Sequence, residues 1–168
     1  MMTLRVGVIM YQTSLTKGQE LVAQRMVAEF RRQGYDAFLI TSIFHDSEPV
    51  GPIDDVVGRG GYVQFFDERL GIPIVRVNSE AATWPPRRAA LRDFTAILGR
   101  IVGELKLNVL ITHSTLWNGP EEVLKFIHWK RKMAEKGSPD GVPLFLHMSH
   151  FQEANEERYL LSERSFRE

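Results

Sequence analysis

The chain of 168 residues contains no cysteine. Disulfide bonds, thiol nucleophiles and cysteine-ligated zinc sites are therefore excluded, and the composition fits a reducing compartment. Apolar runs are short, and none approaches the roughly 20 residues that cross a bilayer. The first stretch, MMTLRVGVIMYQ, lacks the basic start and the small-residue cleavage site of a signal peptide. We predict a cytoplasmic protein.

The sequence also has no excess of either charge, because 21 Lys and Arg residues balance 21 Asp and Glu residues. No overall field attracts the chain to nucleic acid, so nucleic acid is not an expected partner and any basic site must be local. A hydrophobic fraction of 43% is ordinary for a globular domain with its own core.

Several catalytic motifs are missing. There is no G-x-S-x-G nucleophile elbow, no H-E-x-x-H zinc motif and no G-x-x-x-x-G-K-[ST] phosphate loop. A D-x-D motif, typical of metal-dependent sugar transferases of another fold, is absent as well. Serine-hydrolase and zinc-protease chemistry are therefore not expected, and we predict no metal site.

Short apolar, β-branched runs alternate with amphipathic stretches along the chain. Continuous apolar runs of this length are typical of strands buried on both faces. Strands are predicted at 4–11, 37–41, 74–77, 109–112 and 144–148, with one extra strand at 62–66 in the loop-rich stretch 43–71. Helices are predicted at 18–33, from 86 or 87 to about 105, and at 121–136. The alternation predicts a Rossmann-like, doubly wound, mainly parallel α/β sheet over 1–150, followed by a charged helix or tail at 151–168.

The stretch TSLTKGQE, at 13–20, joins the first strand to the first helix. In a sheet of this kind, the first βα turn is the usual anion site, because the helix start presents free N–H groups. Gly18 allows close approach of a ligand and Lys17 adds positive charge. Thr16 and Gln19 have capping-box spacing, and Gly34 fits a helix end. An ordinary capped helix after a βα turn is the alternative interpretation.

The segment VGVIMYQTSLTKGQELVAQRMVAEFRRQGYDAFLIT resembles the opening of the retaining GT-B glycosyltransferases of the family-four type, which include glycogen synthases and mannosyltransferases. In that group the first strand leads to a loop ending G-G-x-E, and a strand with G-[HY]-x-V-x-[VL] follows the helix. Residues 17–20 match the loop motif, with Lys17 in place of the first glycine, and 34–39 match the strand motif.

Two later segments extend the resemblance. NVLITHSTLWNGPEEV, at 108–123, is similar to the family's D-[VI]-[VI]-H-x-H-[SN], with His113 and Ser114 on the closing pair and Ile111 in place of the earlier histidine. VPLFLHMSHF, at 142–151, is similar to P-[VL]-[VIL]-x-T-x-H-[DE]. The family histidine falls between His147 and His150 in this second segment, which leaves its register ambiguous.

The resemblance implies an enzyme that moves a sugar from a nucleotide-diphosphate donor to a hydroxyl acceptor, with no cofactor besides that donor substrate. The family's N-terminal half holds the acceptor, which is a sugar, a lipid or a glycan. Its C-terminal half binds the donor and carries an E-x7-E pair, which this chain lacks. We therefore expect an acceptor-side domain of a truncated or split enzyme, inactive without a donor-binding partner.

Resemblance and physics together suggest roles for individual residues. Diphosphate or acceptor contacts are assigned to the backbone around Thr16, Lys17, Gly18 and Gln19, acceptor contacts to His113 and Ser114, and a catalytic contact to His147 or His150. Imidazole suits these tasks because it donates to or accepts from sugar hydroxyls and stabilises charge near a leaving phosphate. The alternative is that the histidines only tie strand ends to neighbouring loops.

The helix around LKFIHWKRKMAEK, at 124–136, combines basic and aromatic residues. A basic face of this kind can make a peripheral contact with an anionic membrane or bind a polyphosphate. The favoured interpretation is a solvated helix back whose aromatic residues pack inward.

Two other functions fit the same fold. One is a free-standing flavodoxin-like or response-regulator-like module that binds a ligand or a partner at the same sheet edge. The other is one half of a sugar-nucleotide epimerase. Thr13, Ser14 and Thr16 only partly match the hydroxyl-rich loop that holds a flavin phosphate, and the first strand ends without an acidic cluster.

Overall fold

The computed structural model describes residues 4–10, 12–13, 18–41, 43–44, 61–77, 88–113, 119–137 and 143–148. Its centre is a six-stranded sheet in the order β5-β6-β3-β1-β7-β8. The parallel strands are β1 (Arg5–Ile9), β3 (Asp36–Thr41), β6 (Ile72–Val77), β7 (Val109–His113) and β8 (Leu144–Met148), and β5 (Tyr62–Asp67) pairs antiparallel with β6. This order confirms the predicted Rossmann-like, doubly wound α/β fold.

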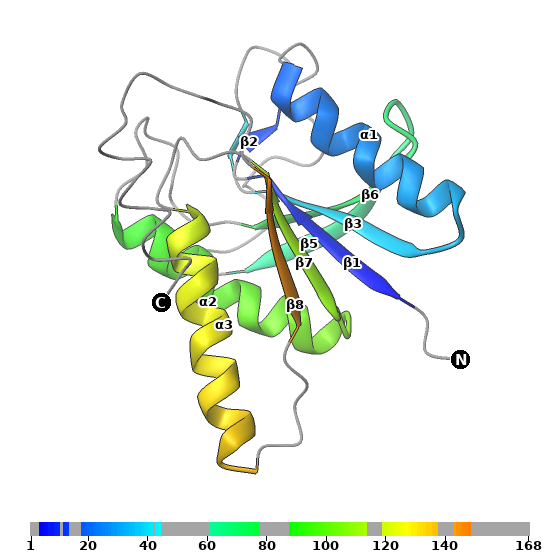
Figure 1. The fold of residues 1–168 in the computed structure, drawn as a ribbon. Coiled ribbons are helices and arrows are strands. Elements are labelled where there is room, and N and C mark those ends of the chain that lie inside the picture. The colour runs from blue at the N-terminus through cyan, green and yellow to red at the C-terminus, as the bar shows by residue number, and fades with distance from the viewer. Residues whose placement is uncertain are drawn as a thin grey trace.

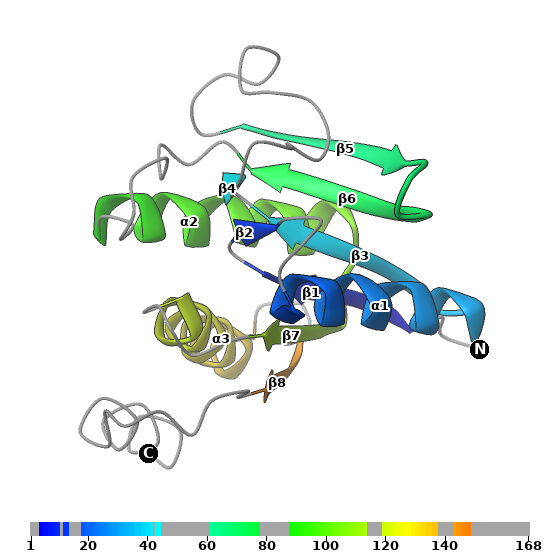
Figure 2. The ribbon, with the colours of Figure 1, turned by 90° about the horizontal axis from the view of Figure 1, so that it is seen from above.

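Three helices cover the sheet on two sides (Figure 1). Seen from above, α1 (Gly18–Arg32) lies on one face, whereas α2 (Arg88–Glu104) and α3 (Gly119–Glu135) lie on the other (Figure 2). Each helix connects two parallel strands, as the right-handed crossover rule requires. Within the described part of the chain, no helix is both long and apolar enough to cross a membrane.

A second, two-stranded parallel sheet joins β2 (Gln12–Thr13) to β4 (Ile43–Phe44). Neither strand was predicted, because two residues are too few to show a period. The pairing has a simple origin: β1 and β3 are neighbours, so the chains that leave them in the same direction stay side by side. The loop after β1 is thereby attached to the loop after β3.

Alternate residues of the central strands enter two separate cores. Against α1 lie Val6, Val8, Ala37, Leu39, Ile74 and Ile111, among others. Against α2 and α3 lie Ile9, Phe38, Ile40, Val75, Val77 and Leu110. Both faces of β1, β3 and β6 are therefore buried, which explains why these strands read as nearly continuous apolar runs.

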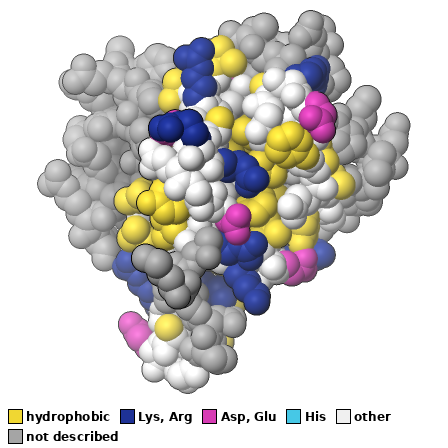
Figure 3. Space-filling view, turned by 90° about the vertical axis from the view of Figure 1, so that its right-hand side faces the viewer, with side chains coloured by type: hydrophobic (Ala, Val, Ile, Leu, Met, Phe, Trp, Pro, Cys, Tyr) yellow, Lys and Arg dark blue, Asp and Glu magenta, His cyan; other side chains and the backbone are white. Residues whose placement is uncertain are grey.

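The strand β8 is more exposed than predicted. Leu144 and Leu146 on β8 are 59% and 46% exposed, so the expectation of burial on both faces is wrong there. The reason is position: β8 is an edge strand, and α1 lies over β1, β3 and β6 instead. The space-filling view of the α1 side shows hydrophobic side chains exposed between basic ones (Figure 3).

The burial of side chains on helix α3 also differs from the prediction. Its Phe126 and Ile127 are buried, but Trp129 is 53% exposed while Lys130 is buried. The prediction that the aromatic residues of this helix pack inward is thus wrong for Trp129.

The helix ends follow known capping chemistry. Gly34 has φ +88°, its N–H donates to the Arg31 carbonyl at 2.9 Å, and the Tyr35 N–H donates to the Phe30 carbonyl at 3.0 Å. This left-handed cap confirms the helix end predicted at Gly34. At the other end of α1, Thr16 of the predicted capping pair Thr16–Gln19 lies outside the described residues.

Gly7 on β1 leads to a test of core packing. A Cβ atom at this position would lie 2.9 Å from the Cδ1 atoms of both Ile40 and Leu107, and 3.2 Å from Leu110 Cδ2. Because these side chains are buried and close-packed, we expect Gly7→Ala to lower the free energy of unfolding by about 1–3 kcal/mol. Urea unfolding measures it, with Gly103→Ala on α2 as control, where nothing lies within 4 Å. Equal stability of the two variants would contradict this account of the core.

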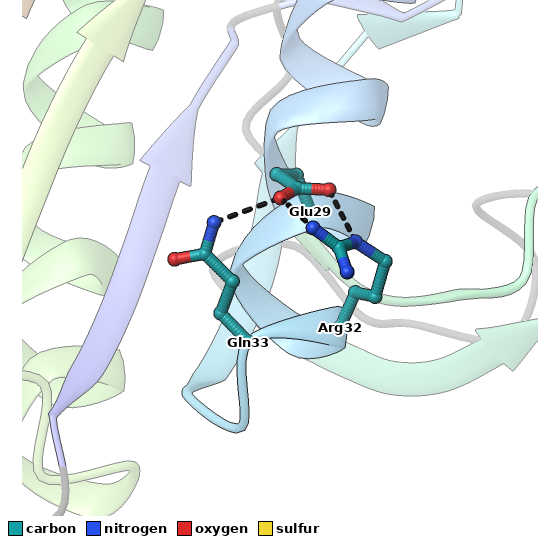
Figure 4. A network of polar contacts seen from close by, with 3 residues as sticks. All are labelled: Glu29, Arg32 and Gln33. Atoms are coloured by element: carbon teal, nitrogen blue, oxygen red, sulfur yellow. Dashed lines mark hydrogen bonds and ion pairs between the residues drawn. The ribbon is translucent and has the colours of Figure 1, made fainter.

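Glu29 leads to a test of pH dependence. Its carboxylate accepts hydrogen bonds from Arg32 Nε at 2.8 Å, Arg32 Nη2 at 2.6 Å and Gln33 Nε2 at 2.8 Å (Figure 4). The hydrogen bonds from Arg32, then that from Gln33, lower the pKa of Glu29 from 4.5 to about 2. The ionised form is favoured in the folded state, so its contribution is present above pH 4.5 and disappears as the pH falls through about 2.

The NMR titration of the Glu29 carboxyl carbon measures this pKa directly. Arg32→Ala should return it toward 4.5, and added salt should raise it because the pair is exposed. An unchanged pKa in Arg32→Ala would show that the contact does not persist in solution.

Candidate functional site

The carboxyl ends of β1 and β7 mark the place where the direction of strand order reverses. From β1 the chain builds outward through β3 to β6, and it then crosses through α2 to β7 on the other side of β1. Loops that leave two such strands diverge and leave a crevice, which is the usual ligand site of doubly wound sheets. The candidate site is therefore the edge formed by the ends of β1 and β7 together with the start of α1.

One row of residues crosses the sheet at this edge on the face that α1 covers. Arg76 on β6 pairs in register with Thr41 on β3. Ile9 on β1 pairs with Thr112 on β7, so the residues that follow them, Met10 and His113, lie opposite each other. Alternation along the strands assigns positions 10, 41, 76 and 113 to the same face as the α1 core.

Buried polar residues are concentrated at this edge. Among the described residues the buried polar or charged ones are Glu20, Gln24, Thr41, Asp67, Arg76, Thr112 and Lys130. Thr41, Arg76 and Thr112 lie at the carboxyl ends of β3, β6 and β7, and Glu20 and Gln24 lie in the first turns of α1. Five of the seven therefore belong to one end of the sheet, whereas the cores below it are apolar.

The charges in this layer are of both signs. Glu20 has 2% of its surface exposed and Arg76 has 3%, and both interact with neighbouring groups. Burying an ionised side chain is costly unless other polar groups solvate it. A carboxylate in the first turn of a helix is also stabilised by the free N–H groups and the positive end of the dipole. The first turns of α1 thus bury the polar Glu20 and Gln24 beside the apolar Ala23.

Sequence reasoning missed most of this layer. Glu20 was noted only as part of a loop motif, and Gln24, Thr41, Arg76 and Thr112 were not singled out. A signal was present for Arg76, because an arginine inside the apolar run IPIVRV has no place in a strand buried on both faces unless it has polar partners. Thr41 and Thr112 are ordinary strand residues whose composition gives no such signal.

The predicted loop residues are only partly described. Gly18 is the first residue of α1 and is exposed, and Gln19 lies in the same turn. Thr16, Lys17, Ser114 and His150 lie outside the described residues. Their assignment to ligand contacts stays a prediction.

The two remaining histidines lie on adjacent strands at the same edge. His113 is the last residue of β7, and His147 pairs in register with Thr112. Alternation puts position 113 on the α1 face and position 147 on the α2–α3 face. Both histidines thus belong to the candidate edge, but they belong to opposite faces of the sheet.

In the described part of the chain, no group of three or more His, Asp or Glu side chains is arranged to hold a metal ion.

Comparison with known proteins gives a fold relative and no sequence relative. No family model matches the chain. No curated protein matches it either. Among solved structures it is similar to a sucrose-phosphate synthase from Thermosynechococcus elongatus, with a TM-score of 0.57 and 11% identity over 96% of this chain. The chain spans 40% of the length of that protein. The likeness supports a glycosyltransferase-like fold.

The buried polar layer can be tested by removing Arg76. We expect Arg76→Ala to lower the free energy of unfolding by about 2–5 kcal/mol, because the stem leaves a cavity and polar neighbours lose an interaction. Arg25→Ala, at an exposed position of α1, should change it by less than about 0.5 kcal/mol. Denaturant unfolding followed by circular dichroism compares the two. Similar small effects would show that burial of Arg76 contributes nothing to the stability of the fold.

Proposed function

We propose that this chain is the acceptor-side domain of a retaining GT-B glycosyltransferase. The whole enzyme transfers a sugar from a nucleotide-diphosphate donor to a hydroxyl acceptor. The donor is bound by a second domain, and the chain described here is inactive without it. The enzyme needs no cofactor besides the donor substrate.

The observation that carries the proposal is the fold match over nearly the whole chain. A likeness that covers 96% of this chain but 40% of a sucrose-phosphate synthase is what one domain of a two-domain transferase would give. The strand order adds a second support, because it reverses at the carboxyl ends of β1 and β7, which is the usual ligand site of doubly wound sheets. Gly18 and Gln19 of the motif at 17–20 begin α1, and the motif at 108–114 includes β7, which ends at this edge, whereas the motif at 34–39 enters β3 from the opposite end of the sheet.

In this proposal the start of α1 binds the anionic part of the reactants. The N–H groups at Gly18 and Gln19, with the Lys17 ammonium group, face a diphosphate or a phosphorylated acceptor. N–H donors that stabilise the departing phosphate lower the barrier more than they strengthen ground-state binding.

The histidines divide the remaining tasks. His113, at a position on the α1 face of β7, and Ser114 contact acceptor hydroxyls. His147 or His150 contacts a sugar hydroxyl or the reaction centre. Position 147 belongs to the opposite face of the sheet from position 113.

A ligand titration of the isolated chain tests the proposal. We expect glucose 6-phosphate or maltose, at millimolar concentration, to shift the amide signals of Gly18 and His113, while Gly34 at the far end of α1 stays unchanged. His113→Gln should weaken this binding about tenfold, as loss of one or two hydrogen bonds does. His128→Gln on α3 is the matched control.

Activity assays complete the test. The chain alone should release no sugar from UDP-glucose, ADP-glucose or GDP-mannose. Sugar transfer by the chain alone would overturn the two-domain assignment, and ligand shifts confined to other parts of the chain would overturn the site. A purified protein with bound flavin, visible as a yellow colour, would favour the flavodoxin-like module.

A further inference from the structure

The C-terminal half of α3 carries an exposed stripe of mixed apolar and basic side chains. Trp129, Lys132, Met133 and Lys136 recur at helical spacing, and all four are exposed. Trp129 is 53% and Met133 is 36% exposed, which is unusual for large apolar side chains four residues apart on a helix that also supplies core residues. This set is called the α3 stripe below.

The Trp129 ring is held in position by contacts with Phe126 and Lys130. Its centroid lies 6.2 Å from that of Phe126, a buried residue of the core facing α2 and α3. The Lys130 ammonium nitrogen lies 5.8 Å from the ring centroid, within the range of a cation–π contact. These contacts hold the exposed indole ring in one orientation. Little side-chain conformational entropy is therefore lost when the ring binds another surface.

The charge around the stripe is mainly positive. From Trp129 to Gly137 the helix end has four basic residues and a single acidic one, although the whole chain has no net charge. The stripe itself contains two lysines and no acid. The partner that complements it is negatively charged and accepts an indole and a thioether side chain.

The stripe lies away from the candidate site. The helix α3 begins after the carboxyl end of β7 and runs back along the sheet, and its C-terminal end extends beyond the strands (Figure 1). A surface contact there would leave the ends of β1 and β7 accessible.

We propose that the α3 stripe binds the surface of an anionic lipid membrane. Tryptophan prefers the headgroup region because its ring is apolar and its N–H is polar, and methionine adds apolar area at the same depth. Lysine stems pass along the apolar boundary and place their ammonium groups among lipid phosphates. The contact is peripheral, since α3 is a helix of 17 residues with a charged stripe. This inference is independent of the glycosyltransferase assignment.

A vesicle sedimentation assay with the full chain tests the inference. We expect binding to vesicles of 70% phosphatidylcholine and 30% phosphatidylglycerol at about 0.1 M salt, and binding at least tenfold weaker to pure phosphatidylcholine. Trp129→Ala and the double variant Lys132→Glu with Lys136→Glu should each weaken the anionic binding by about tenfold or more. Because the lysines are exposed, the double variant tests the stripe without disturbing the contact of Trp129 with Phe126.

Two controls separate this site from general stickiness. Phe66→Ala removes a side chain that is 50% exposed on β5, on a different element, and should bind vesicles like the wild type. A DNA duplex serves as a polyanion without an apolar phase, and it should not compete at concentrations that match the vesicle phosphate. Equal binding to neutral and anionic vesicles, equal loss in Phe66→Ala and Trp129→Ala, or efficient competition by DNA would each overturn the proposal.

Discussion

The parallel pairing of β1 with β3 on one side and with β7 on the other is the constraint on which the rest of the structure depends. It places the first strand in the middle of the sheet, with both faces buried and with its carboxyl end at the point where the strand order reverses. Gly7 makes this position workable, because the absent Cβ leaves room for Ile40, Leu107 and Leu110 to close over the strand. A larger residue would move those side chains from the core they share with α2 and α3.

The same pairing explains why the polar layer lies where it does. Thr41, Arg76 and the start of α1 meet at the last row of the sheet, where the loops begin and where the small β2–β4 sheet holds two of those loops together. A core optimised only for stability would carry apolar residues in this row. Glu20, Gln24 and Arg76 nevertheless lie buried at this edge, which is where ligands usually bind in doubly wound sheets.

The sequence predicted the helices and strands that carry a hydrophobic pattern over several residues. It did not predict the features that depend on which elements lie side by side in the fold. Six strands and three helices were expected within a few residues of their bounds, because apolar runs and four-residue periods accumulate over many positions. β2 and β4 exist only because β1 and β3 are adjacent, which no local pattern records. The exposure of Leu144 and Leu146 likewise depends on where α1 lies, and the exposure of Trp129 on a turn of α3 that directs Lys130 inward instead. For the candidate site, the motifs and the strand order indicate the same edge, but the opposite faces of positions 113 and 147 followed from strand register alone.

The placement of α3 connects the two proposed surfaces. The helix runs antiparallel to β8, so a membrane against its exposed stripe would extend along the strands rather than across their ends (Figure 1). In the proposed transferase, an acceptor carried by a lipid would reach the carboxyl ends of β1 and β7 by lateral diffusion, and a soluble acceptor would reach them from solution. If both proposals hold, docking through the α3 stripe would raise the local concentration of a lipid-borne acceptor, and membrane dependence of acceptor use would be a property of the α3 stripe rather than of the site at the ends of β1 and β7.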